Sequence, residues 1–194
     1  MSDLKIGIIL GSTRPGRNGE QVARWVLEQA QQRSDATFEL IDLLDYNLPH
    51  LDEAVPASAG RYANDHTKAW AAKIDSLDGF VFVTPEYNHS TSGALKNALD
   101  FIYREWNNKA AGIVSYGASG GMRAAEHLRL ILGELQIADV RAQLALSLVH
   151  DFQSYSTLVP TAEHATRLAA ELDQVVSWSG ALQGVREAAL AAAA

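Results

Sequence analysis

Short apolar runs alternate along this chain with longer segments in which apolar residues recur every three or four positions. The run GFVFVT at 79–84 is almost wholly apolar, which is typical of a strand buried on both faces of a sheet. Segment 20–32 instead has apolar residues at helical spacing. We expect strands at 5–10, 37–43, 79–84, 110–115 and 143–149, and helices at 20–32, 63–77, 92–103, 121–135 and 161–178.

Five strands that alternate with five helices favour an α/β fold, in which a parallel sheet carries helices on both faces. No repeat, charge block or linker divides the sequence. We therefore expect one domain over 1–185, followed by an alanine-rich tail at 186–194 that frays. Ligands of such folds bind beyond the carboxyl ends of the strands. If the strand order is 2-1-3-4-5, the loops after the first, third and fourth strands form one continuous rim.

The composition narrows the picture mainly by exclusion. A chain of 194 residues can bury one full core, and no apolar run approaches the ~18 residues typical of a membrane span. The absence of cysteine excludes disulfides and thiolate chemistry, and it fits a cytoplasmic protein. The net charge of -7 argues against binding nucleic acid through its phosphates. We interpret the opening residues MSDLKIGIIL as a strand and not as a targeting peptide.

The loop GSTRPGRNG at 11–19 joins the first predicted strand to the first predicted helix. Free backbone N–H groups and the positive end of the helix dipole favour an anion at a helix N-terminus, so the loop suits a phosphate. Its glycine spacing matches neither GxGxxG nor the P-loop. The alternative is an ordinary turn rich in small residues. The candidate phosphate contacts are Ser12, Thr13, Arg14, Arg17, Asn18 and Gly19.

Two further loops follow the third and fourth predicted strands. After Pro85, the loop offers flat rings at Tyr87 and His89 and an amide at Asn88, which suits a wall for a planar heterocycle. The alternative is a helix-capping loop with incidental aromatic residues, capped by a serine at 90 or 92. The third loop, SYGASGG at 115–121, is glycine-rich and can bring backbone N–H groups close to ring carbonyls.

Other candidate chemistries find less support. The six histidines lack metal-ligand spacing, so we assign no metal, and no GxSxG motif supports a hydrolase. Asp42, Asp45 and Asp52 resemble either a ribose-binding acid or, more simply, a solvated loop. His127 is expected at a helix surface or against a neighbour. Trp106 either lines a substrate cavity or packs at a subunit interface, and we favour the interface.

Taken together, the three loops resemble the NADPH-dependent FMN reductase family, flavoproteins of flavodoxin-like fold that include chromate and quinone reductases. The matching motifs are GSTRPGRNG at 11–19, TPEYNHSTSGALKNALDF at 84–101 and SYGASGG at 115–121. The resemblance covers roughly residues 4–150. It implies a flavodoxin-like three-layer sandwich whose five-stranded parallel sheet has the order 2-1-3-4-5.

The resemblance also implies a cofactor and the residues that hold it. FMN would bind non-covalently, with its phosphate in the first loop at Ser12, Thr13, Arg14, Arg17, Asn18 and Gly19. The isoalloxazine ring would lie against Pro85, Glu86, Tyr87 and Asn88, with Ser115, Tyr116 and Gly117 on its other side. His89 stands where other members often have a tyrosine.

The implied activity is a two-stage oxidoreduction. Hydride passes from NADPH or NADH to FMN, and the reduced flavin then reduces a quinone, free flavin, azo compound or metal oxyanion, which predicts ping-pong kinetics. No side chain is required as a general base, so we assign no catalytic residue. The family implies a homodimer or homotetramer with a small-molecule acceptor. The acidic net charge and the lack of a long apolar run predict neither nucleic acid nor membrane as a partner. The alternative is a flavodoxin-like FMN electron carrier without its own NAD(P)H activity.

Overall fold

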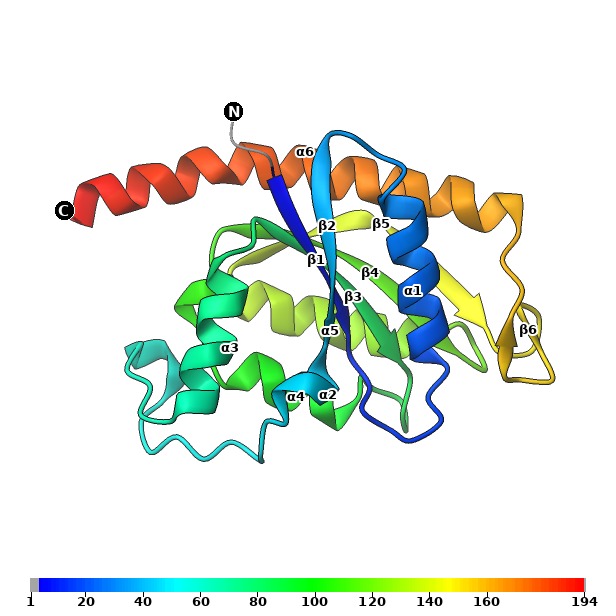
Figure 1. Cartoon of the computed structure of the whole chain (residues 1–194), viewed down its shortest axis with the longest axis horizontal. Coiled ribbons are helices and arrows are strands. Elements are labelled where there is room, and N and C mark those ends of the chain that lie inside the picture. The colour runs from blue at the N-terminus through cyan, green and yellow to red at the C-terminus, as the bar shows by residue number, and fades with distance from the viewer. Residues whose placement is uncertain (1–3, 194) are drawn as a thin grey trace.

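The structure, a computed structural model, describes residues 4–193 and contains one five-stranded parallel sheet (Figure 1). The strands are β1 (Leu4–Leu10), β2 (Ala36–Asp42), β3 (Gly79–Pro85), β4 (Lys109–Gly117) and β5 (Ile137–Ser147). They lie in the order β2-β1-β3-β4-β5. The α/β class and the predicted strand order are therefore confirmed. The expected domain start at residue 1 and tail end at residue 194 lie outside the described residues.

Helices cover both faces of this sheet (Figure 1). The helices α1 (Gly19–Ala30) and α6 (Ala162–Ala193) share one buried apolar cluster with the sheet. The other face carries α3 (Asp65–Asp75), α4 (Gly93–Asp100) and α5 (Met122–Glu134) over a second cluster. Every residue of β3 and β4 is buried, as the unbroken apolar run of β3 predicts for a central strand.

Several short elements escape prediction from periodicity because they span only two to four residues. A single helical turn, α2 (Leu43–Tyr46), follows β2, and two 3-10 turns, η1 (Ala57–Ala59) and η2 (Arg104–Trp106), lie in later loops. A small antiparallel hairpin of β6 (Phe152–Gln153) and β7 (Thr157–Leu158) occupies the connection between β5 and α6.

Two predicted boundaries are wrong. The strand expected at 143–149 begins at Ile137, because polar residues on this half-exposed edge strand interrupt the apolar pattern. The helix expected to end at residue 178 continues to Ala193, where the alanine-rich sequence has high helix propensity, and it extends beyond the sheet (Figure 1). Although α6 has 32 residues, no helix within 4–193 is both long and apolar enough to cross a membrane.

The expectation that Trp106 packs at a subunit interface is also wrong. This side chain is fully buried within the single chain, and its ring lies 5.0 Å from that of Phe80 and 5.9 Å from that of Trp70. Its indole Nε1 donates a hydrogen bond to the Leu99 carbonyl at 3.3 Å. The residues next to Trp106 in sequence are polar, so no local pattern marks it as a core residue. In the structure, η2 turns only this side chain inward.

A buried carboxyl group links α6 to the edge of the sheet. Glu171 is fully buried, and its Oε2 accepts a hydrogen bond from the Leu144 N–H at 2.8 Å. Within residues 4–193, its Oε1 has no hydrogen-bond partner. A Cβ on Gly112 would lie only 2.5 Å from this oxygen. Burial raises the pKa of Glu171 well above its usual 4.5, because desolvation outweighs the hydrogen bond from Leu144.

We expect this carboxyl group to make the protein less stable as the pH rises. The folded state keeps the Glu171 proton to a higher pH than the unfolded chain, so stability falls as the pH rises above the usual value of 4.5. Glu171→Gln should remove that loss. As the pH rises, the free energy of unfolding of the variant should increase relative to that of the native protein by up to about 1.4 kcal/mol per pH unit. Urea unfolding at several pH values measures the difference. Parallel curves for the two proteins would contradict the expectation.

Candidate functional site

Three loops meet at the carboxyl edge of the sheet because β1, β3 and β4 are neighbours. Leu10 pairs with Val83, and Pro85 pairs with Tyr116, so the three strands end at nearly the same level. Backbone bonds continue past the strand ends, with the Glu86 N–H donating to the Tyr116 carbonyl at 3.0 Å. The first loop (11–18), the second loop (86–92) and the third loop (118–121) thus form the continuous rim that the strand order predicts.

The first and second loops are joined by side chains. Ser12 is buried, and its Oγ lies 2.9 Å from the Tyr87 hydroxyl. The Arg14 Nε donates to the same hydroxyl at 3.2 Å, while the rest of this exposed side chain makes no ion pair among the described residues. Thr13 lies half-buried between them in sequence. Arg14 is therefore the cation of the first loop that remains available to a ligand.

Arg17 has a different role from Arg14. Its side chain is only 7% exposed and forms an ion pair with Asp42 at the end of β2. It also donates from Nη1 to the Ser12 carbonyl at 2.5 Å. Asp42 in turn accepts from the Leu44 N–H at 2.9 Å and caps α2, so this carboxylate already has protein partners. Arg17 and Asp42 fix the shape of the first loop.

The first turn of α1 lies open at the end of the first loop. Asn18 precedes the helix without making a side-chain capping bond to it, within the part of the chain that the structure describes. The Asn18 Nδ2 instead donates a hydrogen bond of 2.8 Å to the Tyr155 carbonyl in the β6–β7 hairpin. The N–H groups that begin an α-helix lack partners within the helix, so this N-terminus keeps its attraction for an anion. Gly16, with φ +68, supplies the left-handed turn that leads into it.

Tyr116 lies directly against this helix start. A Cβ on Gly19 would lie 2.5 Å from the Tyr116 hydroxyl oxygen, so the first residue of α1 has no room for a side chain. The hydroxyl is buried and has no hydrogen-bond partner within residues 4–193. Burial raises the pKa of Tyr116 well above its usual 10.0, which keeps the phenol neutral.

The second loop is a tight hairpin. Tyr87 and Ser90 exchange backbone hydrogen bonds of 2.9 and 3.3 Å around Asn88 and His89. Both central residues have positive φ, +50 and +75, as in a type I′ turn. Such conformations are costly for non-glycine residues and cluster at functional sites. The expected serine cap is Ser92, whose Oγ accepts from the Leu95 N–H at 3.0 Å and starts α4.

Glu86 connects the second loop to α5. Its side chain is 6% exposed and forms an ion pair with Arg123, whose backbone N–H also donates to Glu86 Oε2 at 3.1 Å. Burial alone would raise the pKa of Glu86, but the hydrogen bonds from the Arg123 side chain and backbone hold it below its usual 4.5. Glu86 is therefore a fixed anion and a poor proton donor near neutral pH.

The third loop is held by Ser115. Its Oγ donates to the Gly120 carbonyl at 2.7 Å and accepts from Gln143 Nε2 at 3.3 Å. Gly120 and Gly121 have φ values of +72 and +70, and a Cβ on Gly121 would lie 2.8 Å from the Tyr116 nitrogen. Glycine is required here by both the conformation and the lack of space. The backbone can therefore approach a ligand closely beyond Gly117.

Most of the candidate residues from the sequence lie on this rim, but their side chains do not share one task. Ser12, Arg14 and Tyr87 contact one another, whereas Arg17 and Asn18 point to protein partners. The sequence did not indicate the contributions of Asp42, Arg123 and the β6–β7 hairpin. Their partners are 25 to 137 residues away, so no local signal could have found them.

His127 and the second loop enclose the side of the rim next to α5. The His127 Nδ1 lies 3.0 Å from Ser90 Oγ, and its ring lies 5.9 Å from that of His89. An open cavity of about 560 Å³ beside them is lined by Thr91, Lys96 and exposed Leu130. The expectation that His127 lies at a helix surface or against a neighbour is confirmed, because it is exposed on α5 and contacts Ser90. The cavity offers space next to the predicted ring wall.

Comparison with known proteins gives consistent matches. The family model described as NADPH-dependent FMN reductase matches residues 4–151. A Schizosaccharomyces pombe protein named NAD(P)H-dependent FMN reductase is 40% identical over 166 residues, 84% of this chain and 83% of that protein. The quinone reductase of Escherichia coli strain K12 is 35% identical over 138 residues, 66% of this chain and 69% of that protein.

The solved structures add agreement on the fold. The flavoenzyme FerB from Paracoccus denitrificans, described as an NAD(P)H:acceptor oxidoreductase, aligns with a TM-score of 0.72 at 20% identity. The alignment covers 91% of this chain and 97% of that chain. At this identity the likeness shows a shared fold.

The two arginines of the first loop should respond differently to replacement. Arg17→Ala removes the partner of a partly buried carboxylate and of the Ser12 carbonyl, so we expect a loss of about 1–3 kcal/mol in the free energy of unfolding. Arg24→Ala is the matched control, because Arg24 is paired with Glu20 on the exposed face of α1 and should cost less than about 0.5 kcal/mol. Urea unfolding measures both variants. Equal losses in the free energy of unfolding would contradict the role of Arg17 in holding the first loop to Asp42.

Proposed function

This chain belongs to the NADPH-dependent FMN reductase family, and on that basis we propose that its rim of three loops binds FMN non-covalently and uses NAD(P)H to reduce it. The observation that carries the proposal is the open N-terminus of α1 beside Arg14, which lies next to the hairpin wall of the second loop. This combination offers a phosphate site and a surface for a planar ring on the same rim.

The residues present fit this cofactor. Ser12, Thr13, Arg14 and the free N–H groups of the first turn of α1, which starts at Gly19, would hold the phosphate, since a helix N-terminus and a guanidinium both favour a dianion. The Tyr116 hydroxyl is buried against Gly19 with no hydrogen-bond partner among residues 4–193, and it adds a polar group at the same place. Arg17 and Asn18 would act indirectly, by shaping the first loop and by anchoring it to the β6–β7 hairpin.

The ring would be held mostly by backbone. Pro85, Glu86, Tyr87 and Asn88 would form one wall, with the Asn88–His89 turn fixing its shape. Ser115, Tyr116 and Gly117 would form the other side, where Ser115 keeps the glycine turn closed. Glu86 stays ionised in its pair with Arg123, so it would position the loop without transferring a proton.

When bound, FMN supplies the redox chemistry by accepting hydride from NADPH or NADH and passing electrons to a second substrate. The task of this chain is then to orient the ring, keep one face open to small molecules and exclude competing contacts. The relatives named as quinone reductases support a quinone acceptor, and free flavin, azo compounds and metal oxyanions are further candidates. One open face used in turn by donor and acceptor leads to ping-pong kinetics.

The same proposal includes an assembly and a setting. We infer a homodimer or homotetramer in the cytoplasm, with no nucleic acid or membrane partner, in line with the acidic net charge of -7. The second candidate function is a flavodoxin-like electron carrier. Arg14, as an exposed cation in the first loop, favours the reductase over this carrier.

Anaerobic titration of the FMN-loaded protein with NADPH and then NADH tests the proposed function. We expect about one FMN per chain to be bleached by at least one donor. An added quinone should then reoxidise the flavin and itself be reduced. Dithionite serves as the control for a reducible flavin. If dithionite bleaches the bound flavin and neither donor does, the carrier assignment replaces the reductase. If no flavin is retained and free FMN supports no NAD(P)H oxidation, the proposed function is refuted.

A further inference from the structure

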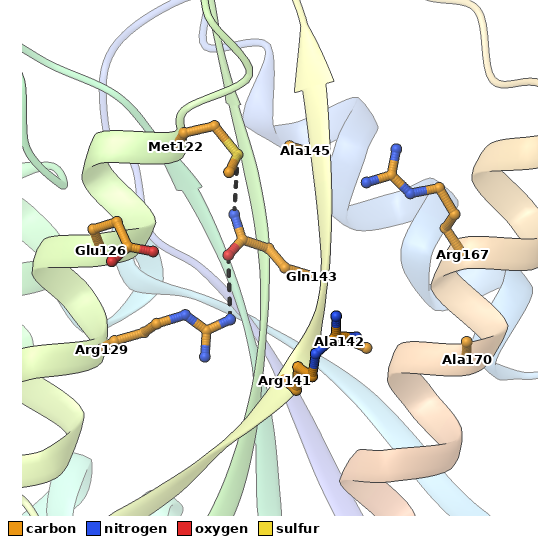
Figure 2. A pocket seen from close by; sticks show the side chains of 9 residues that line it. All are labelled: Met122, Glu126, Arg129, Arg141, Ala142, Gln143, Ala145, Arg167 and Ala170. Carbon is orange, nitrogen blue, oxygen red and sulfur yellow. Dashed lines mark hydrogen bonds between the residues drawn. The ribbon is translucent and has the colours of Figure 1, made fainter.

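A second cavity lies behind the third loop, between α5 and α6 along the open edge of β5 (Figure 2). Its volume is about 570 Å³, which is within the range of small-molecule sites. Arginines from three elements reach it, namely Arg129 from α5, Arg141 from β5 and Arg167 from α6. Small apolar residues such as Ala145 and Ala170 form part of its wall. We refer to this cavity as the arginine cleft.

The three arginines are not equivalent. Arg129 forms an ion pair with Asp139 and donates to the Val140 carbonyl at 2.9 Å and to Gln143 Oε1 at 3.2 Å. Arg141 and Arg167, by contrast, make no hydrogen bond or ion pair with any residue of the described range 4–193. Three arginines and one acidic residue, Glu126, line this cleft, and Arg129 is already paired, so Arg141 and Arg167 leave a local excess of positive charge in a chain whose net charge is -7. Such a local excess of positive charge attracts anions.

A β-bulge presents Arg141 to the cleft. Ala111 pairs with Asp139 but Ile113 pairs with Gln143, so Gly112 alone faces the three residues 140–142. Bulges bend a strand and redirect its side chains, and they are often found beside functional sites. Arg141 lies within this bulge, is exposed, and lines the cleft together with Arg167.

Side chains from both flanking helices hold the bulge in place. The Ala142 N–H donates to Gln174 Oε1 at 3.0 Å, and the Leu144 N–H donates to buried Glu171. The Val140 carbonyl accepts from Arg129 on the other side. Because these backbone groups already have partners, this part of the edge cannot pair with a strand of another chain. The cleft is therefore suited to a small ligand that binds through side chains.

We propose that the arginine cleft binds the phosphate group of a small organic phosphate of about nucleotide size, through Arg141 and Arg167. Guanidinium groups bind phosphate oxygens with directional, charge-assisted hydrogen bonds, and the alanine wall leaves room for an uncharged remainder. The ligand has two chemical sources, the phosphate-bearing end of a dinucleotide such as NADPH or a separate phosphorylated compound. The cleft adjoins the third loop through Gln143, which donates to Ser115 Oγ, but it shares none of the candidate FMN contacts. The proposal does not depend on the proposed function.

The test is isothermal titration calorimetry of the full chain with 2′,5′-ADP, NADP+, NAD+ and inorganic pyrophosphate. We expect the native protein to bind 2′,5′-ADP or pyrophosphate, with an affinity that falls as salt rises. Arg141→Ala and Arg167→Ala should each raise Kd about tenfold, the effect of losing one charge-assisted contact. Arg24→Ala, which removes an exposed arginine elsewhere, is the matched control and should leave Kd unchanged. All variants leave Gln143 and the third loop intact.

The outcomes separate the two sources and the competing explanation. Tighter binding of 2′,5′-ADP and NADP+ than of NAD+ supports a dinucleotide, and preference for pyrophosphate supports a separate phosphate. No binding of any probe at millimolar concentration, or equal Kd in the double variant Arg141→Ala/Arg167→Ala, overturns the proposal. A change of oligomeric state in that variant without probe binding overturns it too, and assigns the cleft to contact between copies. FMN affinity of the same samples reports on the rim separately.

Discussion

The adjacency of β1, β3 and β4 in a parallel register is the constraint on which the site depends. Parallel strands that begin at one edge end at the other, so their three following loops must meet. Backbone bonds fix the loop starts, and the contact between Ser12 and Tyr87 joins loops that are 75 residues apart in sequence. Glycines at 120 and 121 keep the backbone of the third loop close to Tyr116.

Charged residues divide into those that build the structure and those that remain available. Arg17 with Asp42 and Arg123 with Glu86 tie loops to neighbouring elements, and Arg129 with Asp139 ties α5 to the edge strand. In each pair the two charged groups are in direct contact, so neither depends on a ligand for a partner. Three arginines without an ion pair in the described part of the chain lie instead at the rim or the arginine cleft, where an anion can reach them. Arg14 lies on the rim beside the start of α1, and two others, Arg141 and Arg167, lie in the arginine cleft.

The sequence predicted the parts of the structure that depend on local pattern. Apolar runs gave the central strands, helical spacing gave the helices between them, and loop composition indicated the rim. The edge strand was only half recognised, because Asp139 is polar in sequence yet pairs with Arg129 in a bulged strand. Trp106 was misjudged because its burial depends on Trp70 and Phe80, which come from other elements.

The side-chain directions within the rim were equally beyond sequence reasoning. Arg14 and Arg17 are three residues apart in one polar loop, and their composition gives no reason to separate them. In the folded chain, Arg17 faces Asp42 while Arg14 stays exposed. Asn18 was a candidate phosphate contact, but its side-chain amide donates to the Tyr155 carbonyl, 137 residues away. Long-range partners, which require the fold to be known, decide such roles.

In the proposed function, the first loop and the start of α1 recognise a flavin through its phosphate. The most direct measurement is the affinity of the protein for FMN and for riboflavin, which differ only in that group, in the native chain and in Arg14→Ala. We expect the native chain to bind FMN at least about tenfold more tightly than riboflavin. In Arg14→Ala, the ratio of the two affinities should be smaller. Equal affinities for FMN and riboflavin in the native chain would contradict recognition through the phosphate.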